Sequence, residues 1–259
     1  GYGSNPARGM PYIMGIVVLT DPESGQMLAL MDGIYISDWR TGASAAVAAK
    51  CLAREGTAKI ALVGAGAQNR TAAVCLHQVL PAVALTVADI SAARRAAFCS
   101  EMEQKYGLTV SDAPSVEQAV TGADVVVLLT TAREPFVKAD WIQEGCLTLA
   151  MGSYQQTEDK LILDSDRIIV DCWGQAAHRG ELKPLVDAGR LGESDIAAEL
   201  GLIAAGLTPG RTSPQERIMA VLVGLGAHDV YVAGQVYQRA IAAGRGQRVR
   251  LRHTEKAAS

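Results

Sequence analysis

The sequence lacks long apolar runs, closely spaced cysteines and a strong net charge. Its longest apolar stretches, residues 123–131 and 218–226, fall well short of the roughly 20 residues that a membrane-spanning helix requires. The five cysteines lie far apart and form no Cys-x-x-Cys pair, which predicts reduced thiols and a cytoplasmic location. A net charge of −3 gives no general attraction to nucleic acid or to an anionic membrane surface.

The sequence also lacks the residue patterns that indicate a metal site, nucleophilic catalysis or secretion. The histidines, cysteines and carboxylates show no metal-ligand spacing, so no metal centre is expected. No Ser-His-Asp or Cys-His arrangement indicates nucleophilic catalysis, and the chain opens without the basic and apolar regions of a secretory signal. The one charge run, residues 245–256, has no interleaved aromatics and is interpreted as a solvated terminus.

With 259 residues, 49% of them hydrophobic, the chain is long enough for one large domain or two modest ones. Residues 12–20 and 26–31 are apolar runs separated by turn-forming residues, which predicts an antiparallel hairpin. Residues 37–54 are rich in alanine, the best helix former, and predict a helix whose small side chains permit close packing.

Short apolar runs then alternate with helical segments. Strands are expected at residues 59–63, 84–88, 108–111, 124–129, 146–151, 167–171 and 218–223, and helices at 68–80, 91–106 and 116–121. Strands that are apolar on both faces and separated by helices are typical of a parallel sheet covered on both sides. The fold class predicted is α/β, a Rossmann-type doubly wound parallel sheet. Residues 174–201 are expected to be mostly helix and loop, and 229–243 a helix that joins the N-terminal hairpin in a smaller α+β domain.

A glycine loop follows the first predicted strand of the sheet. Gly64 suits the tight turn, and Gly66 lets the backbone approach a diphosphate at the positive start of the next helix, beside Ala67 and Gln68. The third glycine position holds Asn69, a larger residue that is expected to loosen the packing of helix on strand. The strand, loop and helix together predict a dinucleotide-binding turn.

Asp89 ends the next strand, 23 residues after Gly66. A carboxylate there accepts hydrogen bonds from the adenosine ribose hydroxyls and repels a 2′-phosphate, so NAD is favoured, with NADP possible. Arg94 and Arg95 follow and are able in principle to pair with such a phosphate. We interpret them instead as part of a solvated helix face.

With this loop placed, the chain resembles the ornithine cyclodeaminase and mu-crystallin family over nearly its whole length. The stretches that carry the resemblance are residues 5–11 (NPARGMP), 28–33 (LALMDG), 39–43 (WRTGA), 64–68 (GAGAQ), 122–124 (GAD), 130–135 (TTAREP) and 226–229 (GAHD). The resemblance implies homodimers and NAD(P)-linked chemistry on small α-amino or α-imino acids. It also implies a Rossmann domain over residues 42–229, with residues 1–41 and 230–259 forming a substrate-binding and dimerisation domain.

The resemblance also assigns site residues. Arg40 matches the arginine that holds the substrate carboxylate, for which a planar guanidinium is suited. Thr130, Thr131 and Pro135 match the loop that runs past the nicotinamide ribose, and Gly152 belongs to the glycine-containing loop after a later strand. His228 and Asp229 are candidates for contact with substrate or cofactor. Alternatively, Asp229 is a helix N-cap and His228 an ordinary loop histidine.

Two departures from the family bear on activity. The region that carries a substrate-contacting lysine in members, ahead of the segment at residues 5–11, is not in this sequence. Tyr154 stands where cyclodeaminating members have an aspartate, and a phenol, which loses its proton at about pH 10, is a poor base near neutrality. We therefore predict hydride transfer, as in an imine reductase or an amino-acid dehydrogenase. Ornithine cyclodeamination and a non-catalytic, crystallin-type binding protein are the alternatives.

Overall fold

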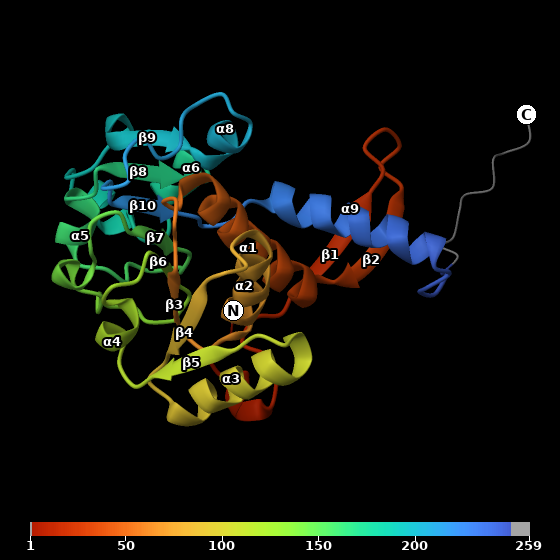
Figure 1. The fold of residues 1–259 in the computed structure, drawn as a ribbon. Coiled ribbons are helices and arrows are strands. Elements are labelled where there is room, and N and C mark those ends of the chain that lie inside the picture. The colour runs from red at the N-terminus through yellow and green to blue at the C-terminus, as the bar shows by residue number, and fades with distance from the viewer. Residues whose placement is uncertain (1, 250–259) are drawn as a thin grey trace, which may run out of the picture. The chain divides into compact units, whose positions relative to one another are not determined.

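A computed structural model describes residues 2–249 of the chain, so the end of the expected basic tail lies outside the described residues (Figure 1). Eight parallel strands form one sheet in the order β5-β4-β3-β6-β7-β10-β8-β9. Their bounds are β3 Lys59–Val63, β4 Ala84–Ala88, β5 Val110–Ala113, β6 Val125–Leu128, β7 Leu147–Ala150, β8 Arg167–Val170, β9 Ile196–Glu199 and β10 Ile218–Val221. The predicted doubly wound sheet is confirmed.

Alternate residues of the central strands feed two separate cores, one on each face of the sheet. In β3, Ile60 and Leu62 join one core, whereas Ala61 and Val63 join the other. The first core is covered by α1 Gly33–Leu52, α2 Ala67–Val79, α3 Ala92–Tyr106 and α8 Leu200–Ala204, and the second by α4 Val116–Val120, α5 Asp159–Leu163, α6 Trp173–Ala176 and α7 Lys183–Asp187. Because helices bury both faces, the central strands β6 and β10 are apolar throughout.

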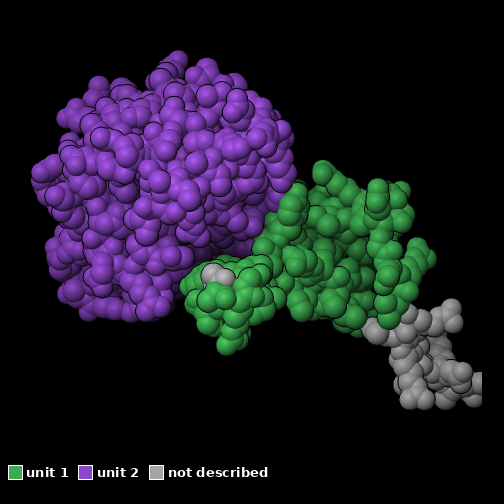
Figure 2. All heavy atoms as spheres, turned by 90° about the horizontal axis from the view of Figure 1, so that it is seen from below, with its two compact units in different colours: residues 1–36, 227–259 green, residues 37–226 purple. Residues whose placement is uncertain are grey.

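The chain divides into two compact units, coloured separately in Figure 2. One holds residues 37–226, with the parallel sheet and its helices. The other holds residues 1–36 and 227–259, and contains the short helix η1 Pro6–Arg8, the antiparallel pair β1 Ile16–Thr20 and β2 Met27–Asp32, and all but the first residue of α9 Gly226–Ala242. The units are thus divided near residues 36 and 226; their assignment as nucleotide-binding and substrate-binding domains stays a prediction.

Three sequence expectations need correction. Helix α1 begins four residues before the expected residue 37, because Asp32 Oδ1 accepts the N–H groups of Ile34 and Tyr35, at 2.8 and 3.3 Å, and so caps it. Strand β9 falls in residues 174–201, where mostly helix and loop were expected; the strand was not foreseen because none of its four residues is fully buried. The strand expected at 108–111 is β5, shifted two residues onward.

The remaining short helices are η2 Ala139–Trp141 and η3 Glu193–Asp195. Within residues 2–249, no helix combines the length and apolarity needed to cross a membrane.

Candidate nucleotide-binding and active site

The glycine loop joins the end of β3 to the start of α2. Gly64 has a φ of +101°, and a Cβ there would collide with the carbonyl oxygen of Leu129, so only glycine fits. Gly66 is different: its φ is −84°, and a Cβ there would meet no atom within 4 Å. The open space at Gly66 lies where the first N–H groups of α2 have no partner inside the helix. With Ala67 and Gln68 in its first turn, α2 presents a site suited to an anion.

Asn69 corrects the expectation of loose packing. Its side chain is fully buried, and Nδ2 donates to the carbonyl oxygens of Val63 and Gly64, at 2.9 and 2.7 Å. The amide therefore fastens α2 to the end of β3, the role that close approach at a third glycine performs in other loops. The larger residue tightens the turn.

Asp89 lies at the end of β4, beside the glycine loop. Its Oδ2 accepts the N–H of Ala65 at 2.9 Å, and Oδ1 accepts the N–H of Ser91 at 2.9 Å. A carboxylate offers about four acceptor positions, so lone pairs remain for ribose hydroxyls. The Asp89 carboxylate thus stabilises the glycine loop and also supplies hydrogen-bond acceptors beside it.

The two arginines after Asp89 differ in environment. Arg94 is exposed, as expected, but the solvated position expected for Arg95 is wrong, because its side chain is buried. Arg95 forms an ion pair with Asp112, and its Nη1 donates to the carbonyl oxygen of Asp89 at 2.6 Å. Arg95 is therefore engaged in structure instead of facing a phosphate.

The loops that follow β6 and β7 are tied together by Gln156. Its Nε2 donates to the carbonyl oxygen of Thr130 at 3.0 Å and lies against Gly152, where any Cβ would overlap it. Thr131 and Pro135 are exposed further along the first of these loops. The structure thus brings Thr130 and Gly152, from adjacent strands, to one fully buried side chain.

Glu181, which the sequence did not single out, anchors this arrangement. Its buried carboxylate accepts the N–H groups of Gln156 and Thr157, at 2.9 and 2.8 Å, and the hydroxyl of Thr157 at 2.5 Å. Burial raises the pKa of Glu181 above its ordinary value, although these three donors act in the opposite direction. A lone glutamate in a loop carries no sequence signal that reveals such a role.

Arg40 lies in the interior of α1 and is half-buried. Helix α1 approaches α2 so closely that a Cβ on Gly42 would sit 2.6 Å from the backbone carbon of Thr71. The guanidinium of Arg40 lies over Gly224, just beyond β10, where a Cβ would come within 3.0 Å of Cζ. Close packing of two helices therefore delivers this guanidinium to the end of the sheet.

Asp171, at the end of β8, holds the backbone under that guanidinium. Its Oδ2 accepts the N–H of Gly224 at 2.6 Å, and Oδ1 accepts the N–H of Cys172 at 2.9 Å. Burial raises the pKa of Asp171, against the effect of these hydrogen bonds. Asp171 is a second carboxylate whose placement the sequence did not reveal.

His228 and Asp229 belong to the other unit, in the first turn of α9. The interpretation of Asp229 as an N-cap is wrong, because α9 begins three residues earlier, at Gly226. A carboxylate in the first turn still interacts favourably with the helix dipole. Their contact with substrate or cofactor stays a prediction.

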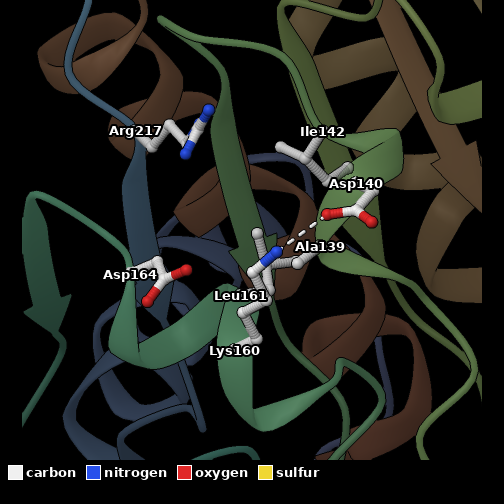
Figure 3. A pocket seen from close by; sticks show the side chains of 7 residues that line it. All are labelled: Ala139, Asp140, Ile142, Lys160, Leu161, Asp164 and Arg217. Atoms are coloured by element: carbon white, nitrogen blue, oxygen red, sulfur yellow. Dashed lines mark hydrogen bonds and ion pairs between the residues drawn. The ribbon is translucent and has the colours of Figure 1, made fainter.

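A different cavity, of about 290 Å³, lies at the opposite edge of the sheet (Figure 3). Arg217 directly precedes β10, and Lys160 forms an ion pair of 2.9 Å with Asp140. This cavity is therefore separate from the glycine loop, which lies at the carboxyl ends of the strands. Across residues 2–249, no group of three or more histidines, cysteines and carboxylates is placed to hold a metal ion.

The candidate residues of the larger unit gather at the carboxyl edge of the sheet. Because all eight strands are parallel, the segments after β3, β4, β6, β7 and β10 meet there. Ligands of open α/β sheets bind at this edge. The open cradle at Gly66, the helix N-terminus and the acceptor at Asp89 fit a dinucleotide such as NAD.

A family model for the ornithine cyclodeaminase/mu-crystallin family matches residues 1–244. The chain belongs to this family. It is 34% identical to an alanine dehydrogenase of Archaeoglobus fulgidus over 250 residues, which are 95% of this chain and 77% of that protein. The predicted family is thereby confirmed.

Solved structures agree with the sequence comparison. A structure of Thermococcus litoralis Δ1-pyrroline-2-carboxylate reductase with NADH and L-proline has a TM-score of 0.89 at 32% identity, covering 96% of this chain and 78% of that one. An archaeal alanine dehydrogenase dimer with bound NAD has a TM-score of 0.90 at 34% identity, with the same coverages, 96% and 78%. These relatives support an oxidoreductase of the imine-reductase type that binds NAD.

Proposed function

We propose that the chain catalyses NAD-linked hydride transfer between a small α-imino acid and the corresponding α-amino acid. The observation that carries the proposal is the open Gly66 cradle beside Asp89, on the same sheet edge as the Arg40 guanidinium. Bound NADH would supply the hydride: the imine carbon accepts it, the imine nitrogen takes a proton, and NAD+ is left.

Arg40 is proposed to clamp the substrate carboxylate. A guanidinium donates two parallel hydrogen bonds to a carboxylate, which fixes both position and orientation. The backbone of Gly224, against which this guanidinium packs, is held in place because its N–H donates to the buried carboxylate of Asp171 at 2.6 Å. Thr130, Thr131, Pro135 and Gly152 are proposed to border the nicotinamide.

His228 and Asp229, in the first turn of α9, are proposed to take part in catalysis, as the family resemblance implies. A histidine side chain is a common general acid in enzymes and is suited to giving the imine nitrogen its proton.

The chain is proposed to act as a homodimer in the cytoplasm. An archaeal relative is a dimer in its solved structure. In the smaller unit, Ile16, Val18 and Leu30 of the two-stranded sheet are more than half exposed, and such an apolar face suits a subunit contact. All five cysteines are free thiols, which fits a reducing compartment.

The test is NADH oxidation with a panel of α-imino acids, formed from 2-oxo acids and ammonia or supplied as cyclic imines. We expect NADH to be consumed with the amino acid as product. Binding of NADH without turnover of any panel member would favour a crystallin-type binding protein. Conversion of ornithine to proline with release of ammonia would show cyclodeamination instead.

Arg40→Lys is the matched variant for the proposed clamp, because it keeps the charge and removes the planar fork. We expect kcat/KM for the imino acid to fall about 100-fold, with the Kd for NADH unchanged. An unchanged kcat/KM would remove Arg40 from the site.

A further inference from the structure

A second cavity of about 390 Å³ opens beside the nicotinamide half of the proposed site. Its walls come from three segments that each follow a strand: residues 133–135 after β6, 153–155 after β7 and 178–184 after β8. Its volume lies within the range of about 300–1,000 Å³ that small-molecule sites occupy. The hydrogen bonds of Gln156 to Thr130 and to Glu181 connect these three segments to one another.

The charges around this cavity are mostly positive. Arg133, Arg179 and Lys183 line it together with a single carboxylate, Glu134. Lys183 forms an ion pair with Asp187. Among the ion pairs of the described residues, none joins Arg133 or Arg179 to a carboxylate. Two guanidinium groups are therefore available to an anion.

Both guanidinium groups are already oriented by neutral neighbours. Arg133 lies over the ring of Tyr154, with Cζ 5.4 Å from the ring centroid. Arg179 Nη2 donates to the hydroxyl of Ser153 at 3.2 Å. These contacts restrict the two side chains without neutralising them, so a carboxylate would gain charge-assisted hydrogen bonds from positioned donors.

The cavity and the Arg40 guanidinium are both built at the carboxyl edge of the sheet. Arg40 lies over Gly224 at the end of β10, β10 pairs with β7, and β7 pairs with β6. Neighbouring strands are about 5 Å apart, so the ends of these three strands span about 10 Å. A short dicarboxylic acid, with one carboxylate at Arg40, is of the right length to bring its other carboxylate to a neighbouring loop of this edge.

We infer that this cavity is a subsite for a second carboxylate, so that the preferred substrates are dicarboxylic α-imino acids. The inference rests on the proposed function and specifies its substrate class. The reaction stays a two-electron reduction of the carbon–nitrogen double bond by NADH, with one proton delivered to the imine nitrogen as proposed above. The second carboxylate takes no part in the chemistry and only positions the substrate.

The experiment compares the imines formed by oxaloacetate and by pyruvate with ammonia, using the full chain and NADH. We expect kcat/KM to be about tenfold higher for the dicarboxylic imine, and this preference to disappear in Arg133→Gln/Arg179→Gln. Lys105→Gln, a change of exposed charge in α3, is the control and should keep the preference. Equal kcat/KM values in the native chain, or a preference that survives the double substitution, would overturn the subsite.

Calorimetric titration of unreactive acids, with NADH present, separates this subsite from the proposed function. We expect succinate to bind about tenfold more tightly than propionate, and the double substitution to abolish the difference. If no imine is reduced but succinate keeps this advantage, the proposed function fails and the subsite stands. If imines are reduced while the two acids bind equally, the subsite fails alone.

Discussion

Gln156 and Thr130 are joined by a hydrogen bond of 3.0 Å, from Nε2 to the backbone carbonyl oxygen, that links the loops after two neighbouring strands. The backbone N–H of Gln156 donates in turn to Glu181, so the buried carboxylate of Glu181 fixes the position of Gln156. Glu181 is a positioning residue, because it acts through Gln156 and Thr157 and touches neither proposed ligand.

Glu181→Gln tests this arrangement by placing an amide N–H opposite one of the backbone donors. We expect the free energy of unfolding to fall by about 1–3 kcal/mol, because a buried donor loses its acceptor. The Kd for NADH should rise about tenfold as the loops proposed to border the nicotinamide loosen. Thermal denaturation and titration of NADH fluorescence measure the two effects.

Glu158→Gln is the control, since Glu158 is exposed and accepts one N–H, that of Ala139, at 3.1 Å. It should leave both quantities nearly unchanged. A Glu181→Gln protein that loses stability but binds NADH as before would limit Glu181 to a role in folding.

Gly64 and Gly66 provide a matched pair that separates folding from binding. Gly64→Ala places a side chain at a φ of +101° and against the Leu129 carbonyl, so we expect a loss of at least about 2 kcal/mol in stability. Gly66→Ala meets no protein atom within 4 Å, so stability should change by less than about 0.5 kcal/mol.

The methyl group of Gly66→Ala would nevertheless occupy the space proposed for the diphosphate. We expect the Kd for NADH to rise at least about tenfold, measured by fluorescence titration beside a thermal melt. Retained NADH affinity in a well-folded Gly66→Ala protein would show that the dinucleotide lies elsewhere.

Much of the fold could be predicted from the sequence, because strands that are buried on both faces consist of recognisable apolar runs. β3 and β4 lie where they were expected, residue for residue. β9 was not predicted, because this partly exposed edge strand has the sequence Ile-Ala-Ala-Glu, which is not an apolar run.

The candidate site was predictable only where a local motif carries the chemistry. The turn at Gly64 and Gly66 is such a motif, since its conformational demands fall on adjacent residues. Glu181 and Asp171 were not identified, because their roles depend on partners 24 to 53 residues away, brought close only by the parallel sheet. Asn69 was misjudged because its size was considered without its two hydrogen bonds.

Asp89 should determine the choice between NADH and NADPH. Asp89→Asn keeps an acceptor oxygen for the Ala65 N–H and removes the charge that repels a 2′-phosphate. We expect the ratio of Kd values, NADPH over NADH, to fall about tenfold in competitive titrations. Asp140→Asn, at the opposite edge of the sheet, should leave this ratio unchanged. Tighter binding of NADPH by the native chain would contradict the assignment directly.

Asp124 should contribute stability that is lost in acid. Its buried Oδ2 accepts the N–H groups of Ala58 and Lys59, at 2.8 and 3.0 Å, and Oδ1 forms an ion pair with Arg54. Burial raises its pKa, but the hydrogen bonds and the arginine together outweigh burial, so the pKa lies below its ordinary value. Because the folded pKa is depressed, the contribution is complete above the unfolded pKa of about 4 and disappears as pH falls through the folded pKa.

Asp124→Asn should therefore lower the free energy of unfolding by about 1–3 kcal/mol at neutral pH, because the negative charge is lost and the side chain becomes a weaker acceptor for the backbone N–H groups. The difference from the native chain should shrink steadily below about pH 4, where the native carboxylate also becomes neutral. Urea denaturation at a series of pH values measures this difference, with the exposed Glu144→Gln as control. A difference that stays constant down to the lowest pH at which the protein folds would show that Asp124 stabilises the chain by packing and not by its charge.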